Sequence, residues 1–211
     1  VIGFLNLDSD KANTFTSMEE CDRLQAFADL AGIAIDNARM YQKMTESAII
    51  DSLTGINNRR SLLNVAEKEF ERSNRHNTSM SIIMLDIDNF KLINDTCGHQ
   101  AGDAVLVNVG KALSAFIRKI DTAGRYGGDE FCIILPETNL IEARAAAIRL
   151  LDAFHKIKVP SISHQEYLQA SLGVACKDEY VSTLEDLLAR SDLAMYQAKK
   201  RGRNRVECFL S

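Results

Sequence analysis

Prolines and paired cysteines are scarce in this sequence, and each scarcity excludes a class of protein. Only two prolines occur among 211 residues, so no rigid linker is expected between the parts of the chain. The five cysteines are odd in number and never form a C-x-x-C pair. This pattern predicts reduced thiols and argues against a disulfide framework or a zinc site. We therefore expect a cytoplasmic protein.

Long apolar runs, a signal peptide and an excess of positive charge are also missing. No run reaches membrane-spanning length, so this part of the chain gives no indication of a membrane. Val1 stands where a complete chain would carry methionine, so we expect a fragment whose full-length protein could be membrane-anchored upstream. The net charge of −4 argues against nucleic acid as a partner. The 46% hydrophobic and 26% charged residues are typical of a globular protein with a sizeable core.

The first fifty residues predict a strand followed by one long helix. Residues 1–8 have the pattern of a short strand that ends in a turn. The helix is expected to begin near Met18, with Ser17 as its N-cap and Glu20 completing a capping box. We expect this helix to continue unbroken through the joint near residues 44–51.

A heptad-like seam runs along the long helix and allows two interpretations. Its apolar positions recur at spacings of four and three. They are Leu24, Ala28, Ala31, Ile35 and Ala38. The helix could pack on its own domain, or it could form a parallel dimer that carries a signal forward. Small alanines allow close approach of a neighbouring helix in both cases.

Beyond the long helix, helical and strand patterns alternate. A buried strand is apolar from Met80 to Leu85 and ends on Asp86 and Asp88, and Gly127 and its neighbour indicate a hairpin. Further helices are expected over 59–75, 101–117, 139–157 and 183–202, and further strands over 122–126, 129–136, 166–176 and 204–210. This alternation predicts an α/β or α+β sheet covered by helices.

Four carboxylates stand at the ends of predicted strands. Alternation along a strand puts Asp86 and Asp88 on one face, and the hairpin carries Asp129 and Glu130. If the hairpin lies beside the first strand, Asp86 and Asp129 converge. Hard oxygen ligands of this kind suit Mg²⁺, and paired ions of this type promote attack of a hydroxyl on phosphorus. Each acid alone could equally be a solvated strand-end or turn residue.

Five spaced motifs resemble those of the GGDEF family, the diguanylate cyclases. The signature-like segment is RYGGDEF at 125–131. The others are DSLTGINNRR at 51–60, DIDNFKLINDTCGHQAGD at 86–103, SLGVA at 171–175 and DLAMYQAKKRGRNRV at 192–206. The resemblance covers about 46–211. It implies a palm-like nucleotide-cyclase fold with a central, mainly antiparallel sheet. It also implies condensation of two GTP into cyclic di-GMP and two pyrophosphates, at a site between two facing domains of a homodimer.

The resemblance also implies roles for individual residues. Asp86, the Ile87 carbonyl and Asp129 would bind Mg²⁺ or Mn²⁺. Asp129 would accept the 3′-hydroxyl proton, and Glu130 is the second catalytic acid, of unspecified role. The residues implied at GTP are Asn94, His99, Asp103, Gly127, Gly128, Lys199 and Arg203.

Chemistry supports some of these roles better than others. Asp103 can accept hydrogen bonds from guanine N1–H and N2–H₂, which adenine lacks, so a buried acid there would favour GTP. The glycines would let the hairpin backbone approach phosphates closely. His99 could instead be a loop histidine bonded to backbone. The basic run that contains Lys199 and Arg203 could instead be a solvated helix end.

A segment just upstream of the hairpin resembles the family's R-x-x-D product site. It contains Arg118 and Asp121, with Arg149 as a further contact from the next helix. An arginine can clamp a phosphate and stack on guanine, so cyclic di-GMP would bind here and inhibit its own synthesis. The alternative is a surface salt bridge.

Residues 1–44 resemble the C-terminal end of a GAF sensor domain, and 45–211 would form the cyclase domain. The N-terminal part would then transmit a signal by setting the spacing of two cyclase domains. Two other functions stay open for the whole chain. They are a non-catalytic module that binds cyclic di-GMP or GTP, and a dimerisation relay.

Overall fold

The structure is a computed structural model that describes residues 18–47, 49–162 and 165–210. The chain divides into two compact units, 1–48 and 49–211, which we describe separately. The strand expected over residues 1–8 and the expected Ser17 cap lie outside the described residues. No helix in the described part of the chain is long and apolar enough to cross a membrane.

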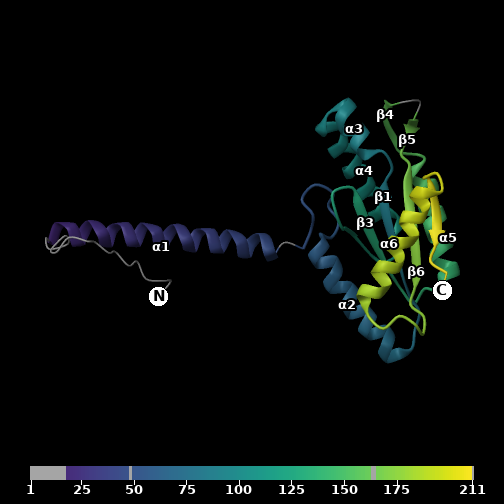
Figure 1. Cartoon of the computed structure of the whole chain (residues 1–211), viewed down its shortest axis with the longest axis horizontal. Helices are drawn as coiled ribbons and strands as arrows, with labels where there is room; N and C mark the ends of the chain where they lie inside the picture. The colour runs from purple at the N-terminus through teal and green to yellow at the C-terminus, as the bar shows by residue number, and fades with distance from the viewer. Residues whose placement is uncertain (1–17, 48, 163–164, 211) are drawn as a thin grey trace. The chain divides into compact units, whose positions relative to one another are not determined.

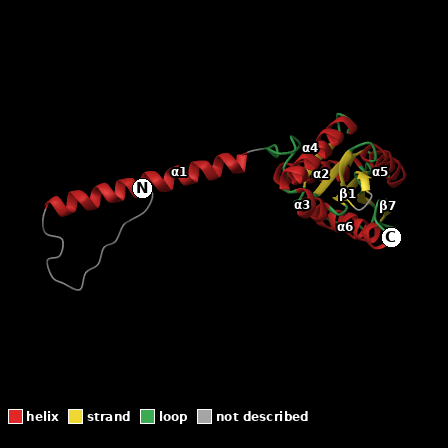
Figure 2. Cartoon of the chain, turned by 90° about the horizontal axis from the view of Figure 1, so that it is seen from above, coloured by secondary structure: helices red, strands yellow, loops and turns green. Residues whose placement is uncertain are grey.

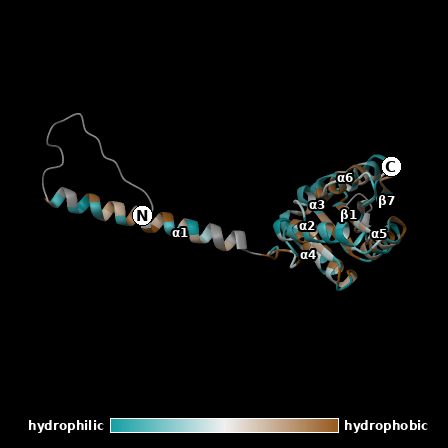
Figure 3. Cartoon of the chain, turned by 90° about the horizontal axis from the view of Figure 1, so that it is seen from below, coloured by the Kyte–Doolittle hydropathy of each residue, from teal (hydrophilic) through white to brown (hydrophobic). Residues whose placement is uncertain are grey.

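The first unit contains the long helix α1, Met18–Ser47, which begins where the sequence predicted. Several of its large apolar side chains are exposed, among them Phe27 and Leu30, and Figure 3 shows apolar and polar segments alternating along it. Both interpretations of the heptad-like seam therefore stay predictions.

The expectation of an unbroken helix through residues 44–51 is wrong. The helix ends at Ser47, and Ile50 already forms an antiparallel bridge with Asn57. Between them the chain turns, because the Gly55 N–H donates to the Asp51 carbonyl at 2.9 Å and Gly55 has a φ of +73°. Glycine adopts that left-handed conformation without the penalty that a Cβ brings.

The second unit is built on a five-stranded sheet in the order β2-β3-β1-β6-β7 (Figure 1). Its neighbouring strands are antiparallel except for β6 and β7, which are parallel. The mainly antiparallel sheet expected from the sequence is thus confirmed. The strands are β1 Met80–Ile87, β2 Thr122–Arg125, β3 Glu130–Pro136, β6 Ala170–Cys176 and β7 Arg205–Cys208.

Helices cover both faces of this sheet, as Figure 2 shows by red helices around yellow strands. One core cluster joins the sheet to α4 and α5, and a second joins the opposite face to α2 and α6. The helices of this unit are α2 Arg59–His76, α3 Phe90–Cys97, α4 His99–Phe116, α5 Leu140–Phe154 and α6 Leu184–Lys200.

Strand β1 is central, and all eight of its residues are buried. Ile83 and Leu85 belong to the cluster with α4 and α5, whereas Ile82 and Met84 belong to the cluster with α2 and α6. A strand that is buried on both faces needs a continuous apolar run, which is what this sequence has. By alternation, Asp86 falls on the same face as Met84, toward α2 and α6.

A second, two-stranded sheet differs from the sequence expectation. It pairs β4, Lys158–Ile162, with β5, Gln165–Tyr167. The single strand expected over 166–176 is instead divided into β5 and β6, and β4 was not expected at all. Pro160 lies within β4, and a proline usually argues against a strand because it cannot donate a backbone hydrogen bond. It is tolerated in edge strands, and both strands of a two-stranded sheet are edge strands.

Candidate active site

Strand pairing brings the hairpin acids to the end of β1. Asp86 lies opposite Glu130 on β3 and opposite Ser171 on β6. The Ile87 N–H donates to the Asp129 carbonyl at 3.2 Å, so the Asp129 backbone lies directly beside the end of β1. Residues far apart in the sequence therefore meet at one end of the central strands of the sheet.

Asp86 is the most perturbed acid of this group. Only 7% of the residue is exposed, and its Oδ2 lies 2.7 Å from the Lys199 Nζ. The pKa of Asp86 is raised to about 6, chiefly by burial; Lys199 opposes this rise, and the charges of Asp129 and Glu130 contribute to it. The two hairpin acids are thus close enough to repel Asp86, as expected for groups that converge.

Asp88 directly follows β1, and its surroundings differ from those of Asp86. It is 1% exposed and accepts hydrogen bonds from the Ser171 hydroxyl at 2.7 Å and the Asn204 N–H at 2.9 Å. Burial raises the pKa of Asp88, and these hydrogen bonds together with the nearby Arg203 and Lys199 charges oppose that rise. Asp88 therefore anchors the turn that follows α6.

That turn has an unusual backbone. Arg203 and Asn204 both have positive φ, 61° and 46°, and Gly202 has a φ of 111°. Non-glycine residues rarely adopt this conformation, so two in succession need an anchor such as the hydrogen bond to Asp88. Lys199 lies in the last turn of α6 and Arg203 just beyond it, so the expected helix end at Gly202 is close to the observed one.

The two hairpin glycines differ in their surroundings. A Cβ on Gly127 would lie 2.5 Å from the Glu130 Oε2, whereas a Cβ on Gly128 would meet nothing within 4 Å. The Gly127 and Tyr126 N–H groups both donate to the Glu130 carbonyl, at 3.1 and 2.8 Å. A side chain at Gly127 would therefore displace the Glu130 carboxylate, whereas open space remains next to Gly128.

Arg125 joins the hairpin to the turn at the start of the second unit, a role that the sequence analysis missed. Its Nε and NH2 donate to the Gly128 carbonyl at 3.1 and 2.8 Å, and its NH1 lies 3.4 Å from the Asp51 carboxylate. Burial raises the pKa of Asp51, but hydrogen bonds from Thr54 and the charge of Arg125 outweigh it and hold that pKa below its usual value. The sequence offered one signal for this contact: the motif at 51–60 begins with an acid and the motif at 125–131 begins with an arginine.

The residues expected at guanine lie on α3 and α4. Asn94 is half-buried on α3, whereas His99 and Asp103 are exposed at the start of α4. Gly102 packs against Asn94 so closely that a Cβ would lie 1.9 Å from the Asn94 Oδ1. Asp103 is exposed in this chain. Selection of guanine over adenine by a buried Asp103 would therefore require the nucleotide or a second domain to cover this side chain.

The expected product-site residues form a local cluster. The Arg118 side chain donates to both Asp121 carboxylate oxygens, at 3.1 and 3.0 Å, and to the Thr138 hydroxyl at 2.8 Å. The hydrogen bonds to Asp121 and the charge of its carboxylate raise the pKa of Arg118. Arg149 is exposed on α5, with its guanidinium 5.9 Å from the Phe116 ring centre. Arg118 is thus held in place and still more than half exposed.

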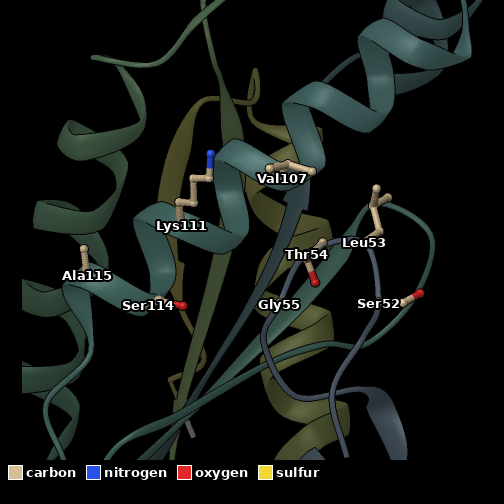
Figure 4. Close-up of a pocket in the computed structure, with 8 residues that line it drawn as sticks. All are labelled: Ser52, Leu53, Thr54, Gly55, Val107, Lys111, Ser114 and Ala115. Atoms are coloured by element: carbon tan, nitrogen blue, oxygen red, sulfur yellow. The ribbon is translucent and has the colours of Figure 1, made fainter. Parts of the chain in front are cut away.

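A cavity of about 650 Å³ lies apart from these groups, between the turn after α1 and helix α4 (Figure 4). None of the residues expected in the active site lines it. Its lining residues are Ser52, Leu53, Thr54, Gly55, Val107, Lys111, Ser114 and Ala115. Among the residues that the structure describes, no three His, Cys, Asp or Glu side chains form a ready metal cluster.

Comparisons with known proteins agree with this geometry. The family model "Diguanylate cyclase, GGDEF domain" matches residues 48–205. The chain is 39% identical over 157 residues to the "Probable diguanylate cyclase DgcC" of Escherichia coli K12, covering 74% of this chain and 42% of that protein. It is 35% identical over 208 residues to "Diguanylate cyclase A" of Treponema denticola, covering 98% of this chain and 56% of that protein. The chain thus spans about half the length of these relatives.

A solved structure shows the same likeness. The crystal structure of the GGDEF domain of DgcB from Caulobacter crescentus, in complex with c-di-GMP, matches with a TM-score of 0.72 and 28% identity. The match covers 78% of this chain and 95% of that one. The palm-like fold expected from the sequence is therefore confirmed.

Proposed function

This chain belongs to the GGDEF family of diguanylate cyclases, and we propose that its second unit condenses two GTP into cyclic di-GMP and two pyrophosphates. The observation that carries the proposal is the meeting of Asp86 with the hairpin acids Asp129 and Glu130. The pairing of β1 with β3 and the hydrogen bond from the Ile87 N–H to the Asp129 carbonyl hold these residues at the same end of the two strands. Acids that approach one another in this way are costly to bury unless a cation lies beside them.

A divalent cation fits this donor set. Members of the family are generally divalent-metal dependent, and carboxylate and carbonyl oxygens are the ligands that Mg²⁺ and Mn²⁺ prefer. Asp86, the Ile87 carbonyl and Asp129 would hold the ion. When bound, it would offset the phosphate charge and polarise the reacting phosphorus.

The reaction needs one proton acceptor at each site. In each half-reaction the 3′-hydroxyl oxygen of one GTP bonds to the α-phosphorus of the other, and the bond to pyrophosphate breaks. Asp129, at the hairpin turn, would accept the proton that leaves the 3′-hydroxyl. Glu130 lies opposite Asp86, where it adds negative charge beside the cation site.

The remaining residues would orient GTP. Asn94 and Asp103 would contact the guanine edge, and Gly102 supports this role because its missing Cβ leaves room for the Asn94 amide. Lys199 and Arg203 would contact the triphosphate from the end of α6. His99 would lie at the nucleotide, and the open space next to Gly128 supports close approach of the phosphates to the backbone.

Two copies of the chain would face each other, because each 3′-hydroxyl must meet the α-phosphate held by the other domain. Residues 1–44, as the end of a GAF-like sensor, would set the spacing of the two cyclase domains through α1. Cyclic di-GMP would bind at Arg118, Asp121 and Arg149 and hold the domains in an unproductive arrangement. The exposed, pre-positioned Arg118 fork supports this role.

Product formation from GTP and Mg²⁺, followed by chromatography, tests the proposal. Cyclic di-GMP is expected from the wild type and not from Asp129→Asn, which removes the charge but keeps the shape. Asp152→Asn, an exposed acid on α5, serves as the matched control and should retain activity. If none of the three makes product at concentrations that force dimers, the chain is a binding module, and titration with cyclic di-GMP should then show binding.

Feedback inhibition has its own test. Arg118→Ala should raise output once product accumulates and leave the initial rate unchanged. Arg75→Ala, an exposed arginine at the end of α2, is the control. Equal inhibition of the Arg118 variant and the wild type by added cyclic di-GMP would refute the product site.

A further inference from the structure

Lys199 and Asp86 form the ion pair at the centre of the candidate active site. The Lys199 Nζ lies 2.7 Å from the Asp86 Oδ2, and the exposed fractions of the two side chains are 31% and 10%. They come from α6 and β1, 113 positions apart in the sequence. The pair therefore exists only because α6 packs on the face of the sheet that carries Asp86.

The charges around this pair do not balance. Asp86, Asp129 and Glu130 carry three negative charges near one another and Asp88 adds a fourth, whereas Lys199 and Arg203 supply two positive charges. An ammonium can offset only part of that charge. A dication beside Asp86 would offset more, but it would repel the Lys199 ammonium strongly at the distance of the observed ion pair.

Lysine is suited to leave such a position. Its ammonium is a compact charge on a flexible four-carbon stem, so it can swing away without moving the helix. Lys199 lies in the last turn of α6. Arg203 is nearby, on the turn after α6 that Asp88 anchors. Cations are favoured at helix C-termini, so this end of α6 can hold the ammonium in more than one position.

We propose that Lys199 is an exchangeable counter-ion of Asp86: it pairs with this carboxylate when no metal is bound, and it must leave for a divalent cation to bind. The released ammonium then meets the triphosphate. Metal and nucleotide therefore bind with positive coupling, because each favours the position of Lys199 that the other needs. The inference rests on the proposed function in taking Asp86 as a metal ligand and Lys199 as a contact of the triphosphate.

Coupling of this kind is reciprocal and can be measured without turnover. The probe is Mn²⁺ alone, titrated into the protein and followed by electron paramagnetic resonance of the free ion. Lys199→Met removes the competing charge and keeps the length of the stem. Lys200→Met, which alters an exposed lysine on the same helix next to Tyr196, controls for the loss of one positive charge. Lys199→Arg keeps a cation beside Asp86.

Without nucleotide, Lys199→Met should bind Mn²⁺ about 5-fold to 150-fold more tightly than the wild type, the usual range of coupling between sites. Lys200→Met and Lys199→Arg should stay close to the wild type. Addition of 3′-deoxy-GTP, which cannot be cyclised, should tighten Mn²⁺ binding to the wild type and have a much smaller effect on Lys199→Met.

Several results would overturn the inference. Equal or weaker Mn²⁺ binding by Lys199→Met would show that Lys199 does not compete with metal, and an equal gain in Lys200→Met would show only general electrostatics. Binding that Asp86→Asn leaves unchanged, or no binding by any variant, would remove the metal site and the inference with it. Absence of cyclic di-GMP synthesis together with the expected Mn²⁺ behaviour would refute the proposed function alone.

Discussion

The contact between α6 and β6 gives the sharpest prediction, because it depends on a single missing side chain. A Cβ on Gly173 would lie 2.1 Å from both the Met195 N and the Ser191 O. Ordinary contact begins at 3.4 Å, so α6 would have to retreat by roughly 3.4 − 2.1 = 1.3 Å. Both obstructing atoms are backbone, so no side chain can rotate away to relieve the clash.

The cost of Gly173→Ala follows from this geometry. Overpacking of this kind costs about 1–3 kcal/mol, and the loss of glycine freedom in the unfolded chain returns roughly 0.4–1 kcal/mol. We expect a net loss of about 1–2 kcal/mol, which for a unit of this size lowers Tm by roughly 2–8 °C. Lys199 lies one turn beyond Met195, so cyclase activity should also fall, by up to about 100-fold for a displacement near 1 Å.

Urea unfolding followed by circular dichroism, together with GTP turnover, measures both effects. Gly128→Ala is the matched comparison, since a Cβ there meets nothing within 4 Å. It should unfold within about 0.5 kcal/mol of the wild type. If phosphates approach this glycine, it should nevertheless lose activity. A Gly173→Ala variant as stable as the wild type would refute the reasoning about the α6 contact.

Three further predictions concern single side chains. Arg125→Gln should lose the link between Asp51 and the Gly128 carbonyl, and the misplaced hairpin should lower kcat by about tenfold or more. Arg125→Lys should recover only part of the lost kcat. Steady-state kinetics measures both effects. Because the pKa of Asp86 is raised to about 6, the folded metal-free protein binds more protons than the unfolded chain between about pH 4 and 6. The free energy of unfolding should therefore fall as pH rises through this range. Asp86→Asn should flatten this dependence in urea titrations at several pH values, and an unchanged dependence would contradict the raised pKa of Asp86. Asp88→Asn should weaken the hydrogen bond that anchors the turn after α6, so KM for GTP should rise while Tm changes little. An unchanged KM would count against that anchor.

Much of the fold could be predicted because its signals are local. The uninterrupted apolar run from Met80 predicted a strand buried on both faces, and the paired glycines predicted the hairpin that joins β2 and β3. The motif spacing also predicted the family, which the comparisons confirm. The end of α1 was missed because the local turn at Asp51 and Gly55 outweighs a weak helical pattern. Strand β4 was missed because Pro160 argues against a strand.

Side-chain chemistry and motif spacing belong to the sequence, so they already predicted which acids, amides and basic residues would serve the proposed reaction. The partners of these residues depend on how the sheet and the helices pack. Asp86 and Asp88 are alike in sequence, yet one pairs with Lys199 and the other with the Asn204 backbone. The reason is physical: Asp86 lies within β1, where the last turn of α6 reaches it, whereas Asp88 follows the strand and meets the turn after α6. Partners so distant in the chain are therefore fixed only when the sheet and α6 pack together.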